Sequence, residues 1–152
     1  MIPLGKTPCF GYRLLWNKKM ILIVEDDLDL ADTCAMLLEM HGYPVKIVAN
    51  GVDALKAMAR RRPALILTDH DLPLMGGPEL CVRVRQAPEL DTVPVILMSA
   101  TDPQGIADPA PYNQFLHKPF KAEQLLATVR TVLANATGRN RWPMAPGSTT
   151  LQ

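Results

Sequence analysis

The chain has only three cysteines, and their spacing suits neither a disulfide framework nor a zinc site. Cys9, Cys34 and Cys81 are an odd number, and no two of them form a CxxC pair. No apolar run approaches the roughly 18 residues of a membrane span. The N-terminus lacks the charged start and unbroken apolar stretch of a signal peptide. We therefore expect a protein of the reducing cytoplasm with no membrane partner.

The chain also has little net charge, but its charged residues are unevenly distributed along the sequence. The formal net charge is +1, yet all 15 acidic residues lie between Glu25 and Glu123. Residues 20–133 contain ten lysines and arginines against these 15 acids, a net charge of −5, and the remaining six bases lie in the two end segments. An acidic central segment argues against a nucleic-acid-binding face on the fold itself.

The length of 152 residues fits one domain with a sizeable core, flanked by two short ends. Residues 1–19 contain two prolines and two glycines without any period, and we predict a disordered leader or a start codon assigned too early, with Met20 as the natural beginning. A partner-binding arm that uses Phe10, Tyr12 and Trp16 is the alternative. Residues 135–152 are rich in Gly, Pro, Ser and Thr and are predicted to form a flexible tail.

Between the ends, short apolar runs alternate with amphipathic stretches of helical period. This alternation predicts an α/β fold with a doubly wound, five-stranded parallel sheet and helices on both faces. The predicted strands are residues 20–25, 45–48, 64–68, 94–98 and 113–117, and the predicted helices are residues 28–41, a helix capped by Asn50, a helix begun by Pro78, and residues 121–134.

The connection between the fourth and fifth strands is irregular. Residues 102–111 include Pro103, Pro109 and Pro111, and proline removes a backbone donor and clashes with the preceding helical turn. At most one short helical turn over residues 103–108 is expected, so a fourth helix is degenerate or shortened.

Polar residues follow four of the predicted strands. Glu25, Asp26 and Asp27 follow the first strand, Asp69 the third, Ser99 the fourth and Lys118 the fifth. Because the carboxyl ends of parallel strands meet along one edge of such a sheet, we expect these residues to share one crevice.

Carboxylates gathered in one crevice stay ionised only with a cation between them. Oxygen ligands suit a hard ion such as Mg²⁺, with Mn²⁺ as an alternative. We assign Asp26 and Asp69 as direct ligands and Glu25 as a ligand through water. Asp69, which stands alone at its strand end, is the best candidate for a nucleophile that attacks phosphorus.

Lys118 and the Ser99 hydroxyl would then bind two oxygens of the transferred group. Each of these residues also has an ordinary role when taken singly: the acids could cap a helix, Asp69 could lie in a turn, and Lys118 could be a solvated charge. Their joint occurrence at successive strand ends favours a common site.

The motifs ILIVEDD, DHDLPLMGG, MSA and HKPF together resemble those of the receiver domain of two-component response regulators, over about residues 20–134. The resemblance implies a flavodoxin-like receiver fold with strand order 2-1-3-4-5, Asp69 as phosphoacceptor, and the main-chain carbonyl of Asp71 as a further metal ligand. It also places Ser99 at the switch hydroxyl, Phe115 at the switch aromatic and, commonly, a cis peptide bond before Pro119.

The resemblance implies a signalling module rather than an enzyme in the usual sense. It would take a phosphoryl group from a histidine kinase or phosphotransfer protein and change its contacts with an unknown downstream protein, as a monomer or weak dimer. The family signals through the face made by its fourth helix, fifth strand and fifth helix, so the proline-bearing segment puts the usual output surface in doubt. Pro78 also replaces the usual apolar residue after the glycines.

Two other functions remain as alternatives. One is a receiver-like binding module that is never phosphorylated. The other is an aspartate-nucleophile phosphatase, because Asp69-His70-Asp71 resembles the DxD motif of haloacid dehalogenases. Those enzymes usually carry the motif on their first strand, whereas here it follows the third.

Overall fold

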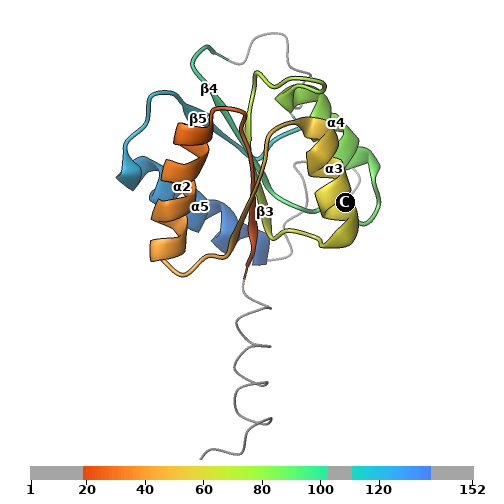
Figure 1. Ribbon diagram of the computed structural model, residues 1–152. Coiled ribbons are helices and arrows are strands. Elements are labelled where there is room, and N and C mark those ends of the chain that lie inside the picture. The colour runs from red at the N-terminus through yellow and green to blue at the C-terminus, as the bar shows by residue number, and fades with distance from the viewer. Residues whose placement is uncertain (1–18, 103–110, 138–152) are drawn as a thin grey trace, which may run out of the picture.

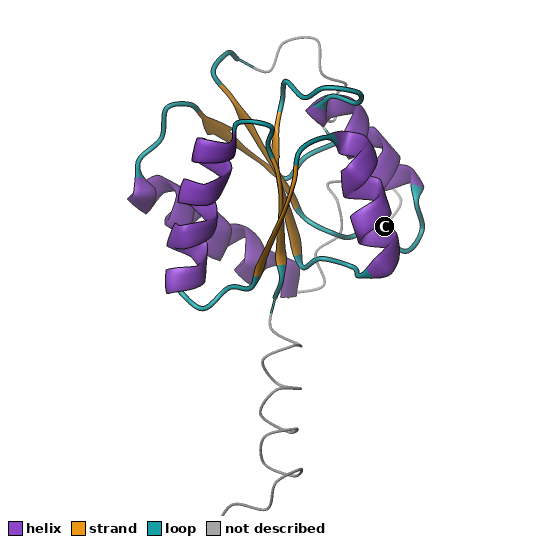
Figure 2. Ribbon diagram, viewed as in Figure 1, coloured by secondary structure: helices purple, strands orange, loops and turns teal. Residues whose placement is uncertain are grey.

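The structure, a computed structural model, describes residues 19–102 and 111–137. Its centre is a parallel sheet in the order β2-β1-β3-β4-β5, as the family resemblance implies, and helices lie on either side of this sheet (Figure 1). The strands are β1 (Ile21–Val24), β2 (Val45–Val48), β3 (Leu65–Asp69), β4 (Val95–Ser99) and β5 (Gln114–His117), and the helices are α2 (Leu28–Met40), α3 (Gly51–Arg60), α4 (Gly77–Gln86) and α5 (Ala122–Thr137). Helices α2 and α5 cover one face of the sheet, and α3 and α4 cover the other (Figure 2).

The three central strands are buried along their whole length, because helices cover both of their faces. Their side chains alternate between two cores. Ile21 and Ile23 pack with the residues of α2 and α5, whereas Leu22 and Val24 pack with those of α3 and α4. This double burial explains why the strands read as unbroken apolar runs and not as alternating patterns.

The register of the sheet aligns the carboxyl ends of the strands. Val24 pairs with Thr68, so that the next residues, Glu25 and Asp69, begin the same edge. On the other side, the backbone N–H of Lys118 donates to the carbonyl of Ser99 at 2.8 Å. The sheet therefore brings together residues that are 93 positions apart in the chain.

The helix ends follow the predicted signals, with one difference in length. The Asn50 side chain accepts a hydrogen bond from the backbone of Asp53 and caps α3, and Gly42 has the positive φ of 90° that suits glycine after a helix. The last helix was predicted to end at residue 134 but continues through Thr137. Ala134, Asn135 and Ala136 permit a helix, and the first strong breaker in the sequence is Gly138.

Most of the proline-bearing connection, residues 103–110, lies outside the described residues, and with it the predicted short turn. The described residues at its far end are held to the sheet by Asn113. The Asn113 side-chain oxygen accepts from the backbone of Val95 at 2.8 Å and from Arg85 Nη2 at 2.7 Å. The entry to β5 is thus tied to both β4 and α4.

None of the described helices is long and apolar enough to cross a membrane. Both described cysteines, Cys34 and Cys81, are free and buried. Burial raises the pKa of the Cys34 thiol to about 11, so the reactive thiolate form is disfavoured at neutral pH.

Gly77 lets α4 begin directly against the end of β3. A Cβ atom at this position would overlap the carbonyl oxygen of Asp69 and lie 3.0 Å from Leu97 Cδ1. We predict that Gly77→Ala lowers the free energy of unfolding by roughly 1–3 kcal/mol, as overpacking does.

The matched control is Gly76→Ala. A Cβ atom there has an ordinary contact of 3.4 Å with the His70 carbonyl oxygen, and the backbone φ of −71° suits any residue. Urea denaturation of both variants measures the difference, and the control should change by less than about 0.5 kcal/mol. Equal stabilities for the two variants would contradict the close approach at Gly77.

Candidate functional site

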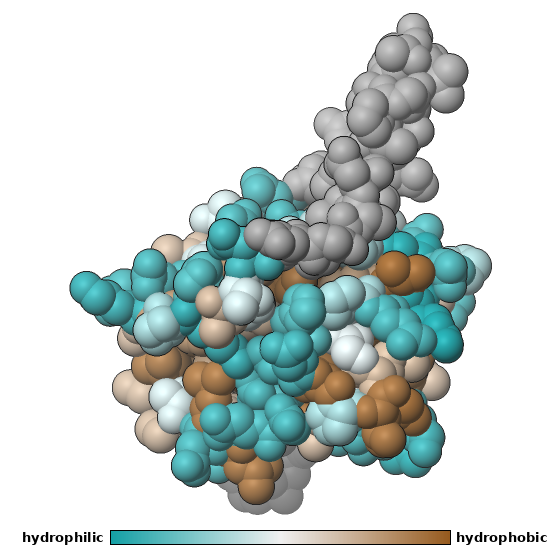
Figure 3. Space-filling model, turned by 90° about the horizontal axis from the view of Figure 1, so that it is seen from above, coloured by the Kyte–Doolittle hydropathy of each residue, from teal (hydrophilic) through white to brown (hydrophobic). Residues whose placement is uncertain are grey.

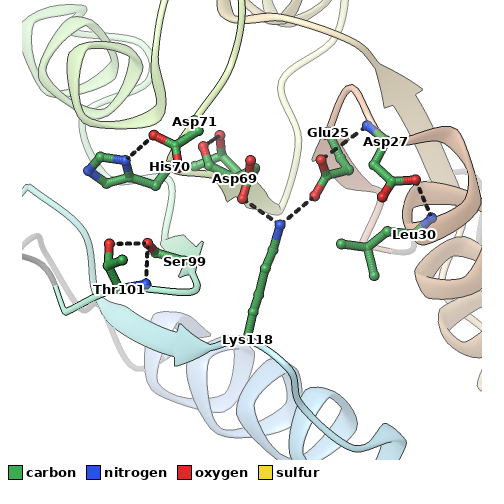
Figure 4. A network of polar contacts seen from close by, with 10 residues as sticks. Glu25, Asp27, Leu30, Asp69, His70, Asp71, Ser99, Thr101 and Lys118 are labelled. Atoms are coloured by element: carbon green, nitrogen blue, oxygen red, sulfur yellow. Dashed lines mark hydrogen bonds and ion pairs between the residues drawn. The ribbon is translucent and has the colours of Figure 1, made fainter.

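The centre of the site is Asp69, the last residue of β3, whose side chain is 9% exposed. Its Oδ1 atom lies 2.6 Å from Lys118 Nζ, and the same ammonium group lies 3.1 Å from Glu25 Oε1 (Figure 4). One cation therefore joins carboxylates that follow two adjacent strands. Hydrogen bonds between charged partners in a partly dry site are the stronger kind.

Glu25 is almost fully buried, with 1% of its side chain exposed. Burial raises its pKa, and the nearby charge of Asp69 acts in the same direction, whereas the backbone N–H of Asp27 and the Lys118 ammonium act against the rise. The N–H of Asp27 donates to Glu25 Oε2 at 3.1 Å. Both Glu25 oxygens thus have partners, which is what an acid at this depth requires.

For the pKa of Lys118, burial and the charged neighbours act in the opposite directions to those for Glu25. Burial by itself would lower the pKa of Lys118, but the hydrogen bonds to Asp69 and Glu25, together with their charges, raise it. The ammonium group is therefore charged at neutral pH, and it partly offsets the repulsion between the two carboxylates.

Glu25, Asp26 and Asp69 form a cluster with at least one ligand oxygen each, and these oxygens all lie within 4.8 Å of one another. Asp26 is exposed, whereas the other two acids are buried. This set offers only oxygens, the ligands that Mg²⁺ and Mn²⁺ accept. A single ammonium group cannot neutralise three carboxylates, so the donor set fits a divalent cation. Figure 3 looks onto this end of the molecule, where hydrophilic side chains run across the middle.

Ser99 ends β4 and is buried, and its hydroxyl contacts Thr101. Its Oγ accepts from the backbone N–H of Thr101 at 3.1 Å and lies 3.2 Å from Thr101 Oγ1. Phe115, the predicted switch aromatic, is half-buried, with ring neighbours Tyr112 and His117 at 6.2 Å. The Lys118–Pro119 peptide bond is cis, as the resemblance implies.

The side chain of Asp71 does not join the acidic cluster. It is 86% exposed and its Oδ1 lies 3.0 Å from His70 Nδ1 (Figure 4). The carbonyl of Asp71 as a metal ligand stays a prediction. A pocket of about 550 Å³ is lined by residues that include His70, Thr101 and His117.

The sequence reasoning did not identify Thr101 or the contact between Asp27 and Glu25. A threonine two residues after a strand-end serine is a recognisable signal, because such hydroxyls bond nearby backbone groups in turns. Asp27 gives no such signal. Its side chain caps α2 as expected, and its role for Glu25 comes from its backbone N–H, which every residue except proline has.

Comparisons with known proteins agree with this geometry. A family model described as "Response regulator receiver domain" matches residues 21–130. Among curated relatives, the response regulator MprA of Mycobacterium sp. (strain KMS) is 32% identical over 134 residues, covering 86% of this chain and 57% of the relative. The phosphate regulon transcriptional regulatory protein PhoB of Rhizobium meliloti (strain 1021) is 33% identical, covering 76% of this chain and 52% of the relative. The chain spans about half the length of these relatives.

Solved structures give the same result. A putative response regulator from Chloroflexus aurantiacus J-10-fl matches with a TM-score of 0.70 and 33% identity, over 78% of this chain and 99% of that chain. The receiver domain of a sensor histidine kinase from Pseudomonas aeruginosa PAO1 matches with a TM-score of 0.71 and 30% identity, over 77% of this chain and 98% of that chain. That structure contains a magnesium ion coordinated in its active site cleft.

The position of Lys118 between two carboxylates predicts a pH-dependent loss of stability when it is replaced. We expect Lys118→Met to lower the free energy of unfolding at pH 7 by roughly 1–3 kcal/mol, because it leaves Glu25 and Asp69 buried without a cation. A carboxyl with a raised pKa in the folded state loses stability as the pH rises through that pKa. The deficit should therefore shrink as the pH falls toward 4.5, the ordinary value for a glutamate.

Urea denaturation across this pH range measures the effect. Lys121→Met is the matched control, since Lys121 is an exposed lysine three residues further along the chain. A deficit that stays constant with pH, or that appears equally in the control, would contradict the assignment.

Proposed function

The chain belongs to the response regulator receiver domain family, and from that premise we propose that Asp69 accepts a phosphoryl group from a histidine kinase or a phosphotransfer protein. The observation that carries this proposal is the ammonium of Lys118, which contacts both Asp69 and Glu25 at the carboxyl edge of the sheet. This arrangement supports the proposal, because a carboxylate, an ammonium group and a cluster of acids then share one crevice.

In the proposed reaction, a carboxylate oxygen of Asp69 attacks the phosphorus of a phosphohistidine. A P–O bond forms to give an acyl phosphate, the P–N bond breaks, and its electron pair returns to the imidazole of the donor. Asp26 and Asp69 would hold Mg²⁺ or Mn²⁺ directly, Glu25 through water, and Asp71 through its main-chain carbonyl. When bound, the ion neutralises charge that develops on the phosphoryl oxygens. Lys118 pairs with another of these oxygens.

The consequence of phosphorylation is a change of surface. Ser99 would leave Thr101 and donate to a phosphoryl oxygen, and Phe115, which is half-buried at rest, would move inward. Such a change shifts an existing equilibrium between two states. The family is one of signalling modules, not of enzymes in the usual sense.

We further propose that the output is contact with a downstream protein, in the cytoplasm where the family usually acts. Residues 20–133 carry a net charge of −5, which disfavours nucleic-acid binding by the receiver itself. Relatives such as PhoB are named transcriptional regulators, and this chain covers only 52% of that protein.

The alternative as an aspartate-nucleophile phosphatase has less support. It needs Asp71 as a general acid near the nucleophile, whereas the Asp71 carboxylate is 86% exposed and contacts His70. The alternative of a receiver-like module that is never phosphorylated predicts an intact fold without labelling.

The acceptor assignment predicts the outcome of one substitution. Asp69→Asn should abolish covalent labelling by radioactive acetyl phosphate with Mg²⁺, because an amide does not attack phosphorus. Asp71→Asn is the matched control: it preserves the main-chain carbonyl, and it should retain labelling within about threefold, since the exposed Asp71 carboxylate pairs with His70 and lies outside the acidic cluster.

Three outcomes separate the candidate functions. Undiminished labelling of Asp69→Asn would exclude Asp69 as the acceptor. No labelling of the unmodified protein would favour the unphosphorylated module. Turnover of a phosphomonoester that requires Asp71 would favour the phosphatase.

The acidic cluster predicts stabilisation by divalent cations. Millimolar Mg²⁺ or Mn²⁺ should raise the melting temperature, because an ion that binds only the folded state stabilises it. Asp26→Asn should remove most of this increase, whereas Asp29→Asn should leave it unchanged, since Asp29 is an exposed acid in the first turn of α2 outside the cluster. Thermal denaturation with and without the ion tests this, and an equal response in both variants would contradict the ligand assignment.

A further inference from the structure

Two surfaces outside the acidic cluster lie on elements that pack on β2, the edge strand. The first is a groove of about 560 Å³ between β2 and α3. Its apolar lining includes Val45 and Val48 from the strand and Ala57 from the helix. Parallel sheets are normally covered, so an apolar groove beside an edge strand is a candidate docking surface.

The border of this groove is basic. The groove is lined by four bases and one acid: Lys46, Lys56, Arg60, Arg61 and Asp53. The Asp53 carboxylate accepts a hydrogen bond from Asn50. Within the described residues, no acidic side chain forms an ion pair with Lys46, Lys56 or Arg60, all of which are exposed. The groove thus has a concentration of positive charge on a segment that is acidic as a whole.

The second surface is the outer face of α2. Asp32, Met36, Glu39 and Met40 are spaced three or four residues apart and are all exposed, so they share this face. The two methionines are 58% and 71% exposed, a large exposure for apolar side chains. Helix α2 contains no lysine or arginine, and no described base pairs with Asp32 or Glu39. This face is therefore acidic and apolar, the complement of the groove.

We propose that two copies of this chain associate along their β2 edges, with the outer face of α2 of each copy on the basic groove of the other. Helices α2 and α3 both pack on β2, from opposite faces of the sheet (Figure 1). A two-fold axis parallel to β2 therefore places the α2 face of each copy on the groove of the other. The dimer contains this contact twice, and no surface remains to add a third copy. The methionines supply buried apolar area, and the charged pairs set the orientation.

The ends of the chain are poor candidates for the same groove. The segments outside residues 20–133 contain six bases and no acid, so the groove would repel them. The acidic and apolar chemistry that fits the groove is instead found on α2 of the chain itself.

Sedimentation velocity of the full chain tests the proposal, over a range of protein concentrations at low and high salt. The wild type should form a dimer that weakens as the salt concentration rises, because the charged pairs are screened. The double variant Lys56→Glu/Arg60→Glu reverses the groove, and Asp32→Lys/Glu39→Lys reverses the helix face. For each variant alone, the dissociation constant of the dimer should rise by roughly a hundredfold or more, because like charges then face each other across the contact.

The decisive measurement is an equimolar mixture of the two reversed variants. Each contact in the mixed dimer then joins opposite charges, so the mixture should regain the dimer that neither variant forms alone. Arg130→Glu, an exposed base on α5, is the control and should dimerise like the wild type. Circular dichroism and the melting temperature of each variant show that it is folded.

Several results would overturn the proposal: a monomeric wild type at the highest concentration, a dimer that survives both reversals, or folded variants whose mixture stays monomeric. A dimer that forms only after residues 1–19 are removed would show that this segment of the chain, and not a second copy, occupies the groove.

Discussion

The site depends on the ion pairs that the Lys118 ammonium group forms with Asp69 and Glu25. The ammonium group lies 2.6 Å from Asp69 and 3.1 Å from Glu25, two carboxylates that are less than a tenth exposed. Removing such charges from water is costly unless they are paired. The fold makes this pairing possible: Lys118 follows β5, the acids lie at the ends of β1 and β3, and the register of β1, β3, β4 and β5 sets the distances between them.

The same pairing bears on the proposed phosphorylation of Asp69, because it sets the charge of the crevice. At rest, one oxygen of Asp69 is occupied by Lys118 and one oxygen of Glu25 shares the same cation. Three acids with one ammonium leave an excess of negative charge, and that excess is what a divalent cation would neutralise. The resting crevice therefore attracts cations, and a bound cation would neutralise the negative charge that opposes the proposed phosphoryl group.

Most of the fold could be predicted from the sequence, because the strands are buried on both faces and read as apolar runs with polar residues after them. The strand order 2-1-3-4-5 came from the family resemblance and is confirmed. The positions of Glu25, Asp69 and Lys118 followed from the rule that parallel strands end at one edge. The exact end of α5 could not be predicted, since Ala134 and Ala136 permit a helix without requiring one.

The sequence did not reveal contacts made by a backbone group, or contacts between side chains that are far apart in the chain. The backbone N–H of Asp27 donates to Glu25, and such a backbone donor has no signature in a sequence. Arg85 and Asn113 are 28 residues apart, and only the packing of α4 beside β4 brings them together.

The two hydrogen bonds of Asn113, to Val95 and to Arg85, also bear on how a change at the site could reach the protein surface. Ser99 ends β4, and Asn113 bonds to the first residue of the same strand while it also accepts from Arg85 on α4. Phe115 lies two residues after Asn113, on β5. If Ser99 moves toward a phosphoryl group, as proposed, it acts on a strand whose first residue is bonded to Asn113, directly before β5. This bond would then connect Ser99 with Phe115 through the sheet.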